Sequence, residues 1–139
     1  MPSIKLNHFN VWTTDLRQSV QFYSTVVGLT QGARPAFRVP GAWLYDSTGT
    51  PVLHLVDVGS ATRDELTEAG DRDLATLGGS GSIDHIAFEA TDLENFRARV
   101  RNASVTWRET HFPAFDLMQI FISDPDGVQV ELLFRNLSK

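Results

Sequence analysis

The 139-residue sequence contains no cysteine, and this absence limits the chemistry that it can support. No disulfide framework, thiolate metal site or cysteine nucleophile is available. Any bound metal ion must therefore be held by nitrogen and oxygen ligands. His, Asp and Glu are the candidate residue types.

The sequence also lacks a run of Lys or Arg, and its net charge is −5 with a pI near 5.2. Binding to nucleic acid or to an anionic membrane needs a basic surface, so neither is expected, and small molecules are the expected partners. No stretch of about 18 apolar residues occurs, and the N-terminus has no basic segment followed by an apolar one. We expect a soluble, cytoplasmic protein.

The first part of the sequence predicts a βαβββ module over residues 4–58. Residues 4–12 alternate in character and are rich in β-branched and aromatic side chains, which is typical of a strand. Asp15 is suited to cap a helix, apolar residues follow at helical spacing, and Gly28 is placed to end that helix. Three more strands are predicted, separated by turns at Pro40-Gly41 and Thr48-Gly49: residues 30–39, 42–46 and 51–58.

Residues 82–135 repeat the same order of elements at an offset of 77 residues. His8 aligns with His85, and Asp15 aligns with Asp92 as a helix cap. A repeat of this kind indicates two copies of one supersecondary unit, neither of which can bury its sheet alone. The two copies must therefore pack together or exchange between chains.

Residues 59–81 separate the two modules and are polar, acidic and rich in glycine. We interpret them as a linker with a short helix over residues 63–69, and a lid over the site is the alternative. The length of the chain and its 42% hydrophobic content predict one domain spanning residues 1–139.

Four polar residues occupy equivalent positions in the two modules: His8 and His85 in the first strands, His54 and Glu131 in the last strands. His54 follows His8 by 46 residues, and Glu131 follows His85 by 46. Side chains alternate along a strand, so the apolar neighbours face the helices and these four face away from them. A carboxylate within the apolar segment 128–134 is costly unless it is paired or metal-bound. We predict a metal site, although each residue taken singly could be structural or solvated.

The sequence resembles the vicinal oxygen chelate superfamily in three stretches: LNHFNV opens the first module, IDHIAFEATDL opens the second and FISDPDGVQVELL closes it. This superfamily includes glyoxalase I, methylmalonyl-CoA epimerase, fosfomycin-resistance enzymes, extradiol dioxygenases and bleomycin-binding proteins. The resemblance covers almost the whole chain. It implies an α+β fold in which two βαβββ modules form an open eight-stranded barrel around one divalent metal ion. It also implies His8, His85 and Glu131 as ligands, and a homodimer, because many relatives swap modules.

The position of His54 leaves two enzymatic hypotheses open. As a fourth ligand it leaves two positions of an octahedron for a bidentate substrate, as in glyoxalase-type lyases and isomerases. Off the metal it would be a general base, since imidazole has an ordinary pKa of about 6.5, as in Fe(II) extradiol-type dioxygenases. Those dioxygenases carry a Tyr ten residues before the ligand Glu131, where this sequence has Phe121. The first hypothesis is therefore preferred, and a metal-free binding or resistance protein is the third.

The ligand set suits Fe, Mn, Ni, Co or Zn. On these hypotheses the catalytic residues are His54 and Glu131. Arg34 and Arg38, near the Pro40-Gly41 turn, could hold an anionic group of a substrate, or they could be solvated and have no specific role.

Overall fold

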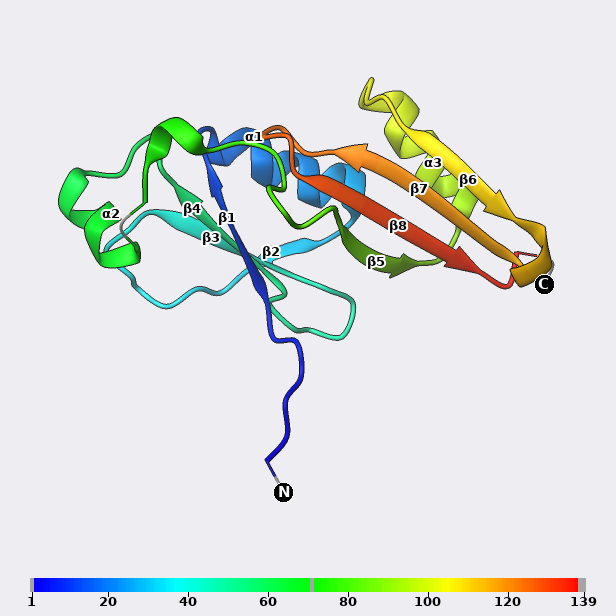
Figure 1. Cartoon of the computed structure of the whole chain (residues 1–139), viewed down its shortest axis with the longest axis horizontal. Coiled ribbons are helices and arrows are strands. Elements are labelled where there is room, and N and C mark those ends of the chain that lie inside the picture. The colour runs from blue at the N-terminus through cyan, green and yellow to red at the C-terminus, as the bar shows by residue number, and fades with distance from the viewer. Residues whose placement is uncertain (1, 71, 138–139) are drawn as a thin grey trace. The chain divides into compact units, whose positions relative to one another are not determined.

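The structure is a computed structural model that describes residues 2–70 and 72–137 (Figure 1). The chain divides into two compact units. The first extends to Ser24 and includes Gly28–Thr76, and the second contains Thr25–Val27 and the chain from Leu77 onward. Asp71, in the predicted linker, lies outside the described residues. Within them, no helix is both long and apolar enough to cross a membrane.

The first unit contains a four-stranded mixed sheet with the strand order β1-β4-β3-β2. β1 runs parallel to β4, and the other neighbours are antiparallel. In chain order the elements of this part are β1 (Phe9–Thr13), α1 (Leu16–Gln21), η1 (Phe22–Val27), β2 (Thr30–Gly32), β3 (Gly41–Tyr45), β4 (Leu53–Asp57), α2 (Arg63–Ala69) and η2 (Leu74–Thr76).

The second unit repeats this arrangement in a sheet with the strand order β5-β8-β7-β6. The first strand is again parallel to the last, and the other pairs are antiparallel. Its elements are β5 (Ile86–Ala90), α3 (Leu93–Asn102), β6 (Arg108–Phe112), η3 (Pro113–Phe115), β7 (Leu117–Ser123) and β8 (Gln129–Arg135). The predicted α+β class and the duplicated βαβββ order are confirmed.

The strand registers show the same duplication residue by residue. Phe9 pairs with Leu53 in the first sheet, and Ile86 pairs with Val130 in the second. Both members of the second pair lie 77 residues after those of the first. The offset found in the sequence is therefore also the offset between hydrogen-bonded positions.

Each sheet buries one face and leaves the other open. Leu53 and Leu55 of β4 are buried on either side of His54, which is part-exposed on the opposite face. In the second unit α3 contributes Phe96, whose ring lies 5.7 Å from that of Phe134 on β8, and both are buried. The predicted assignment of apolar residues to the helix-covered face is confirmed.

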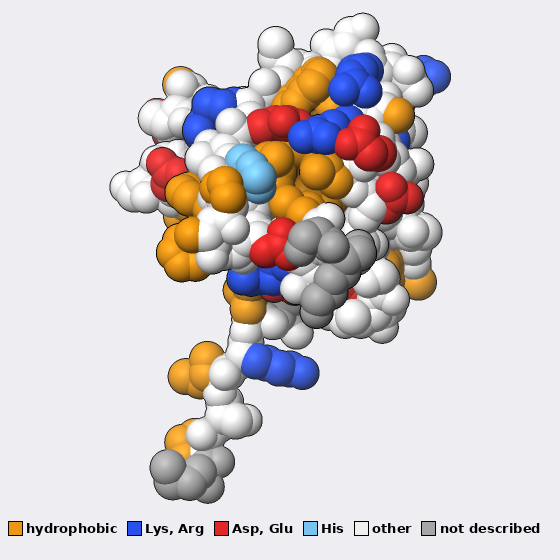
Figure 2. Space-filling model, turned by 90° about the vertical axis from the view of Figure 1, so that its right-hand side faces the viewer, with side chains coloured by type: hydrophobic (Ala, Val, Ile, Leu, Met, Phe, Trp, Pro, Cys, Tyr) orange, Lys and Arg blue, Asp and Glu red, His pale blue; other side chains and the backbone are white. Residues whose placement is uncertain are grey.

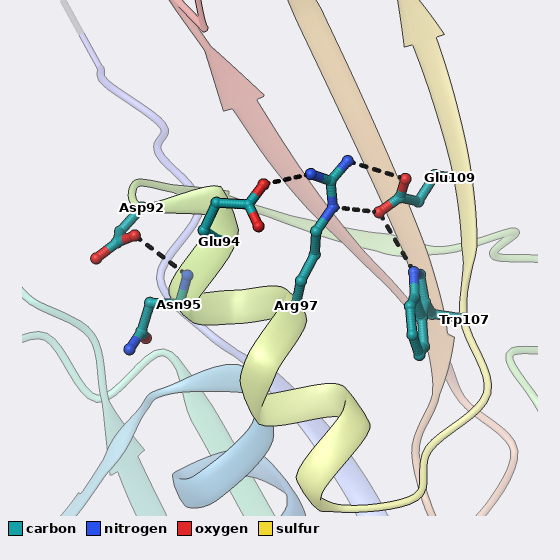
Figure 3. Close-up of polar contacts among 6 residues, drawn as sticks. All are labelled: Asp92, Glu94, Asn95, Arg97, Trp107 and Glu109. Carbon is teal, nitrogen blue, oxygen red and sulfur yellow. Dashed lines mark hydrogen bonds and ion pairs between the residues drawn. The ribbon is translucent and has the colours of Figure 1, made fainter.

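A polar network fastens α3 to β6 (Figure 3). Arg97 donates to Glu109 through Nε at 2.8 Å and through Nη2 at 3.1 Å, and it also pairs with Glu94 at 2.5 Å. The indole Nε1 of Trp107 donates to the same Glu109 carboxylate at 3.3 Å. Hydrogen bonding from Arg97 lowers the pKa of Glu109, and Glu109 in turn raises the pKa of Arg97.

The predicted helix caps and the predicted turn at Thr48-Gly49 form, whereas Gly41 of the predicted Pro40-Gly41 turn is the first residue of β3. Asp15 and Asp92 cap α1 and α3 by accepting hydrogen bonds from backbone N–H groups three residues on. Gly28 ends the first helical segment with a φ of 104°. Gly127 closes the turn that starts at Asp124 with a φ of 86°, in the left-handed region that glycine adopts without strain. The predicted linker helix is α2, which Thr62 caps.

The predicted first strand is too long at its N-terminal end. It was expected from Ile4, whereas β1 begins at Phe9, and Ile4 and Leu6 are 99% and 86% exposed. The segment 2–7 extends away from β1 (Figures 1 and 2). The strand that pairs with β1, β4, begins only at Leu53, so it does not extend far enough to pair with this segment. Alternation of side chains alone therefore does not make the segment a strand. His8 consequently precedes β1 by one residue, as His85 precedes β5.

Two further expectations about the first module were wrong. The strand expected over residues 30–39 ends at Gly32, because Pro35 has no N–H for a ladder and restricts the residue before it. Residues 33–40 form a loop instead. The single helix expected after Asp15 changes at Phe22 into a π-helical segment, in which the Gly28 N–H bonds to the Tyr23 carbonyl.

Candidate metal-binding residues

The first unit brings His8 and His54 together on the open face of its sheet. Their rings are stacked, with centroids 3.7 Å apart and an interplanar angle of 16°. Trp43 lies directly opposite His54 in the β3–β4 register, and its indole stacks on the other face of the His54 ring at 4.0 Å and 7°. The His54 imidazole is therefore held between two rings.

The Nε2 atom of His54 is buried and has no hydrogen-bond partner among the described residues. Burial lowers the pKa of His54, and the nearby His8 lowers it further. Both effects favour the neutral imidazole, the form that binds a metal ion or accepts a proton.

The second unit brings His85 and Glu131 together at the equivalent place. Nε2 of His85 lies 3.0 Å from Oε2 of Glu131, and the Glu131 residue is only 4% exposed. Phe121 lies opposite Glu131 in the β7–β8 register and meets the His85 ring edge-on, with centroids 5.4 Å apart. The second carboxylate oxygen, Oε1, is buried without a partner in the described part of the chain.

In His8 and His85, the ring nitrogen Nδ1 contacts a side-chain oxygen of the preceding residue. Oδ1 of Asn7 lies 2.6 Å from Nδ1 of His8, and Oδ2 of Asp84 lies 2.7 Å from Nδ1 of His85. An acceptor at Nδ1 favours the tautomer with its proton there and leaves Nε2 free as a ligand, an arrangement common around metal-bound histidines. Sequence reasoning did not assign this role to Asn7 and Asp84, although the 77-residue alignment places one on the other.

The four predicted ligands thus occur as two pairs, one on each unit. Among residues 2–70 and 72–137, no group of three or more potential ligands gathers that could hold a metal ion alone. The chemistry of each pair nevertheless suits a divalent ion: His54 in one unit and Glu131 in the other each keep a buried atom unpartnered, at a cost that a bound metal would remove. The 3.0 Å between His85 and Glu131 also suits two ligands on one ion at bond lengths of about 2.1 Å.

The two arginines singled out in the sequence occupy different surroundings. Arg38 is exposed, with 61% of its side chain accessible, and it pairs with Glu68 of α2 at 2.7 Å. Arg34 is part-buried and lines a cavity next to His54 in the first unit.

The family model of the Glyoxalase/Bleomycin resistance protein/Dioxygenase superfamily matches residues 5–132 of the chain. A comparison with curated protein sequences finds no match. Among solved structures, the chain is similar to a glyoxalase family protein from Bacillus anthracis, with 15% identity, a TM-score of 0.69 and coverage of 98% of each chain.

Two other similar structures are those of a lyase and of a binding protein. A lactoylglutathione lyase from Agrobacterium tumefaciens is 18% identical, with a TM-score of 0.65, over 98% of this chain and 97% of that one. An antibiotic binding protein from Streptomyces sp. CB03234 is 21% identical, with a TM-score of 0.65, over 98% of this chain and 99% of that one. At these identities the likeness shows a shared fold.

Proposed function

We propose that this chain, which belongs to the Glyoxalase/Bleomycin resistance protein/Dioxygenase superfamily, is a divalent-metal-dependent enzyme of the glyoxalase type. It would act as a lyase or isomerase on a small substrate that binds through two adjacent oxygens. The metal would be Fe, Mn, Ni, Co or Zn, held by His8, His54, His85 and Glu131.

The main support for this proposal is the matched pair of unsatisfied buried atoms. His54 Nε2 and Glu131 Oε1 lie at equivalent positions of the two modules, and neither has a partner among the described residues. A buried polar atom without a partner costs about 1–3 kcal/mol, and more when the group is charged. If both atoms were ligands of one metal ion, the ion would be the missing partner of each, which would explain why both duplicated positions keep such an atom.

Each residue has a distinct role in this proposal. The metal would supply Lewis-acid stabilisation of the negative charge that develops on two adjacent substrate oxygens. Asn7 and Asp84 orient the two histidines that follow them, through the contacts at Nδ1. Glu131 is the anionic ligand, and its low exposure excludes water from one side of it. His54 has a buried Nε2 without a partner among the described residues, and Trp43 stacks on its ring.

A homodimer is part of the same proposal. Each unit contributes only two ligands, and a module of one chain can complete its site with the complementary module of a second chain as well as with its own. Symmetric dimers of this kind bury the same surface on both subunits.

A second candidate function is that of an Fe(II)-dependent extradiol-type dioxygenase, in which His54 stays off the metal and transfers protons. The observation that favours it is the unpartnered His54 Nε2 beside the metal-ligand candidate His8. Phe121 opposes it, because its ring has no hydroxyl where those dioxygenases carry a Tyr.

Elemental analysis of protein purified without chelator tests the proposal. We expect about one metal ion per chain in the wild type, and loss of metal in His85→Ala, because imidazole is a primary ligand. His111→Ala is the matched control, since His111 is an exposed histidine on β6 and should keep full metal content. Wild-type protein that remains metal-free after reconstitution would contradict the proposal and leave a ligand-binding protein.

His54→Ala distinguishes the two enzymatic functions. Reduced metal affinity identifies His54 as a ligand, whereas full metal content with lost activity identifies it as a base. The metal-loaded protein is then assayed with a hemithioacetal of a 2-oxoaldehyde, and with a catechol under oxygen. Turnover of the hemithioacetal supports the glyoxalase type, and oxygen consumption with the catechol would replace it by the dioxygenase.

A further inference from the structure

A cavity of about 150 Å³ lies within the first unit, beside the proposed metal ligand His54. It is lined by the open face of the sheet, by the loop of residues 33–40 and by Ala69 at the end of α2. The side chains that matter for its chemistry are Arg34, Phe37, Trp43 and His54. A cavity of this volume accepts one benzene-sized ring.

Four rings form a continuous row, and three of them, those of His54, Trp43 and Phe37, line this cavity. His8 stacks on His54, His54 stacks on Trp43, and the centroid of Trp43 lies 6.3 Å from that of Phe37. The guanidinium of Arg34 lies 5.3 Å from the centroid of Phe37, at the far end of the row. The cavity thus has one proposed metal ligand, His54, at one end, a cation at the other and aromatic walls between them.

Arg34 is incompletely satisfied in this position. Its Nη2 donates to the Val39 carbonyl at 2.8 Å, while its Nε is buried without a partner in the described part of the chain. None of the described carboxylates forms an ion pair with Arg34, and burial lowers the pKa of its guanidinium. The guanidinium is part-buried, and an anion that accepts from its buried Nε would satisfy this donor.

Two features next to Arg34 fix its surroundings: the close approach of Gly41 and a hydrogen bond from Tyr45. A Cβ on Gly41 would come within 2.0 Å of the Leu55 carbonyl oxygen and 3.1 Å of Nη2 of Arg34, so only glycine fits at the start of β3. The hydroxyl of Tyr45 donates to the Ala33 carbonyl at 2.5 Å, which ties the start of the loop to the sheet.

We infer that this cavity binds a planar aromatic carboxylate, with the carboxylate on Arg34 and the ring against Phe37 and Trp43. The inference rests on the proposed function in one respect, which is that the substrate is taken to react at the end of the cavity next to His54. The substrate class is then a monocyclic aromatic acid whose two adjacent oxygens lie on the side of the ring away from the carboxylate. The aromatic walls select the ring, and the guanidinium selects the charge.

Binding of benzoate to metal-free protein, kept in chelator, tests the cavity separately from the metal. The reporters are the NMR signals of the Trp43 indole N–H and the Arg34 Nε–H, assigned with Trp43→Phe and Arg34→Gln. Benzamide is the matched neutral probe, because it has the same shape without the charge. We expect saturable shifts of both signals with benzoate and binding of benzamide that is weaker by about tenfold or more.

Three variants complete the test. Arg34→Gln should weaken benzoate binding about tenfold or more, whereas Arg38→Gln should leave it unchanged, because Arg38 is exposed and paired with Glu68. Phe37→Ala, a change at a residue that is 54% exposed, should weaken binding without affecting the fold, which spectral dispersion checks. Equal affinity for benzoate and benzamide, an unchanged affinity in Arg34→Gln, or no shift at Trp43 would each overturn the inference.

The outcome does not depend on the metal site. Arg34-dependent benzoate binding by a chain that cannot be loaded with metal would keep the cavity and reject the proposed enzyme. Metal loading that is abolished in His85→Ala, in a chain that does not bind benzoate, would do the reverse.

Discussion

Replacing Glu131 with Gln should make the metal-free protein more stable while it abolishes metal binding. Glu131 is 4% exposed, and Oε2 of its carboxylate lies 3.0 Å from Nε2 of His85. The unpartnered Oε1 costs about 1–3 kcal/mol as a buried acceptor, and the charge adds to this. Gln can donate an amide N–H to the unprotonated Nε2 of His85 and removes the charge, so we expect a gain of about 1 kcal/mol or more in the free energy of unfolding.

The assay is urea denaturation at pH 8, in chelator and again with metal at about a hundredfold excess over its dissociation constant. Metal should stabilise the wild type by about 2.7 kcal/mol at that excess, and should leave the Gln variant unchanged. Glu89→Gln on neighbouring β5 is the matched control. Its side chain is 74% exposed and pairs with Arg135 at 3.3 Å, so the expected change is within about 0.5 kcal/mol.

A metal-free Gln variant that is less stable than the wild type by about 1 kcal/mol or more would contradict this prediction. Such a loss would mean that Glu131 is a structural partner of His85, and that its carboxylate is not kept at a cost for a ligand. Equal stabilisation of both proteins by metal would lead to the same conclusion.

Three further predictions concern the core, the polar network and the assembly. Phe96→Ala should cost about 3–5 kcal/mol by thermal or urea unfolding, because the side chain is fully buried; a loss below about 1 kcal/mol would contradict this packing. Glu109→Gln should cost about 1 kcal/mol at pH 7. Because Arg97 lowers the folded-state pKa of Glu109, this difference from the wild type should persist above pH 4.5 and vanish as the pH falls through that lowered pKa; a difference that remains at pH 2 argues against the ion pair. Unfolding and refolding a mixture of His8→Ala and His85→Ala chains should restore about a quarter of the sites if modules are exchanged between chains, and none if each chain completes its own site, as metal analysis would show.

Local features of this protein follow directly from its sequence, because they depend on neighbouring residues. The caps at Asp15 and Asp92 and the turn at Thr48-Gly49 need only a side-chain oxygen or a permitted backbone conformation a few residues away. The duplication is equally visible, since an offset of 77 residues aligns ligand candidates, caps and strands together. The side of the sheet on which His54 lies follows from alternation with its apolar neighbours.

Features that depend on a partner distant in the sequence could not be predicted in this way. The alternation of Ile4 and Leu6 resembles a strand, but β1 starts at Phe9, where β4 provides hydrogen bonds. In the same way, the loop of residues 33–40 replaces the end of a predicted strand. That loop places Arg34 beside the cavity, and no pattern in the sequence distinguishes it from the exposed Arg38.

The family, the two βαβββ modules and the four ligand candidates could all be predicted from the sequence, because each depends on residue type and spacing. How those candidates are held depends on tertiary contacts: His54 lies between two rings, Glu131 is nearly excluded from solvent, and His8 and His85 are each oriented by the residue before them. Burial and stacking arise from strands brought together in a sheet, so they depend on the registers, which residue type and local spacing do not specify.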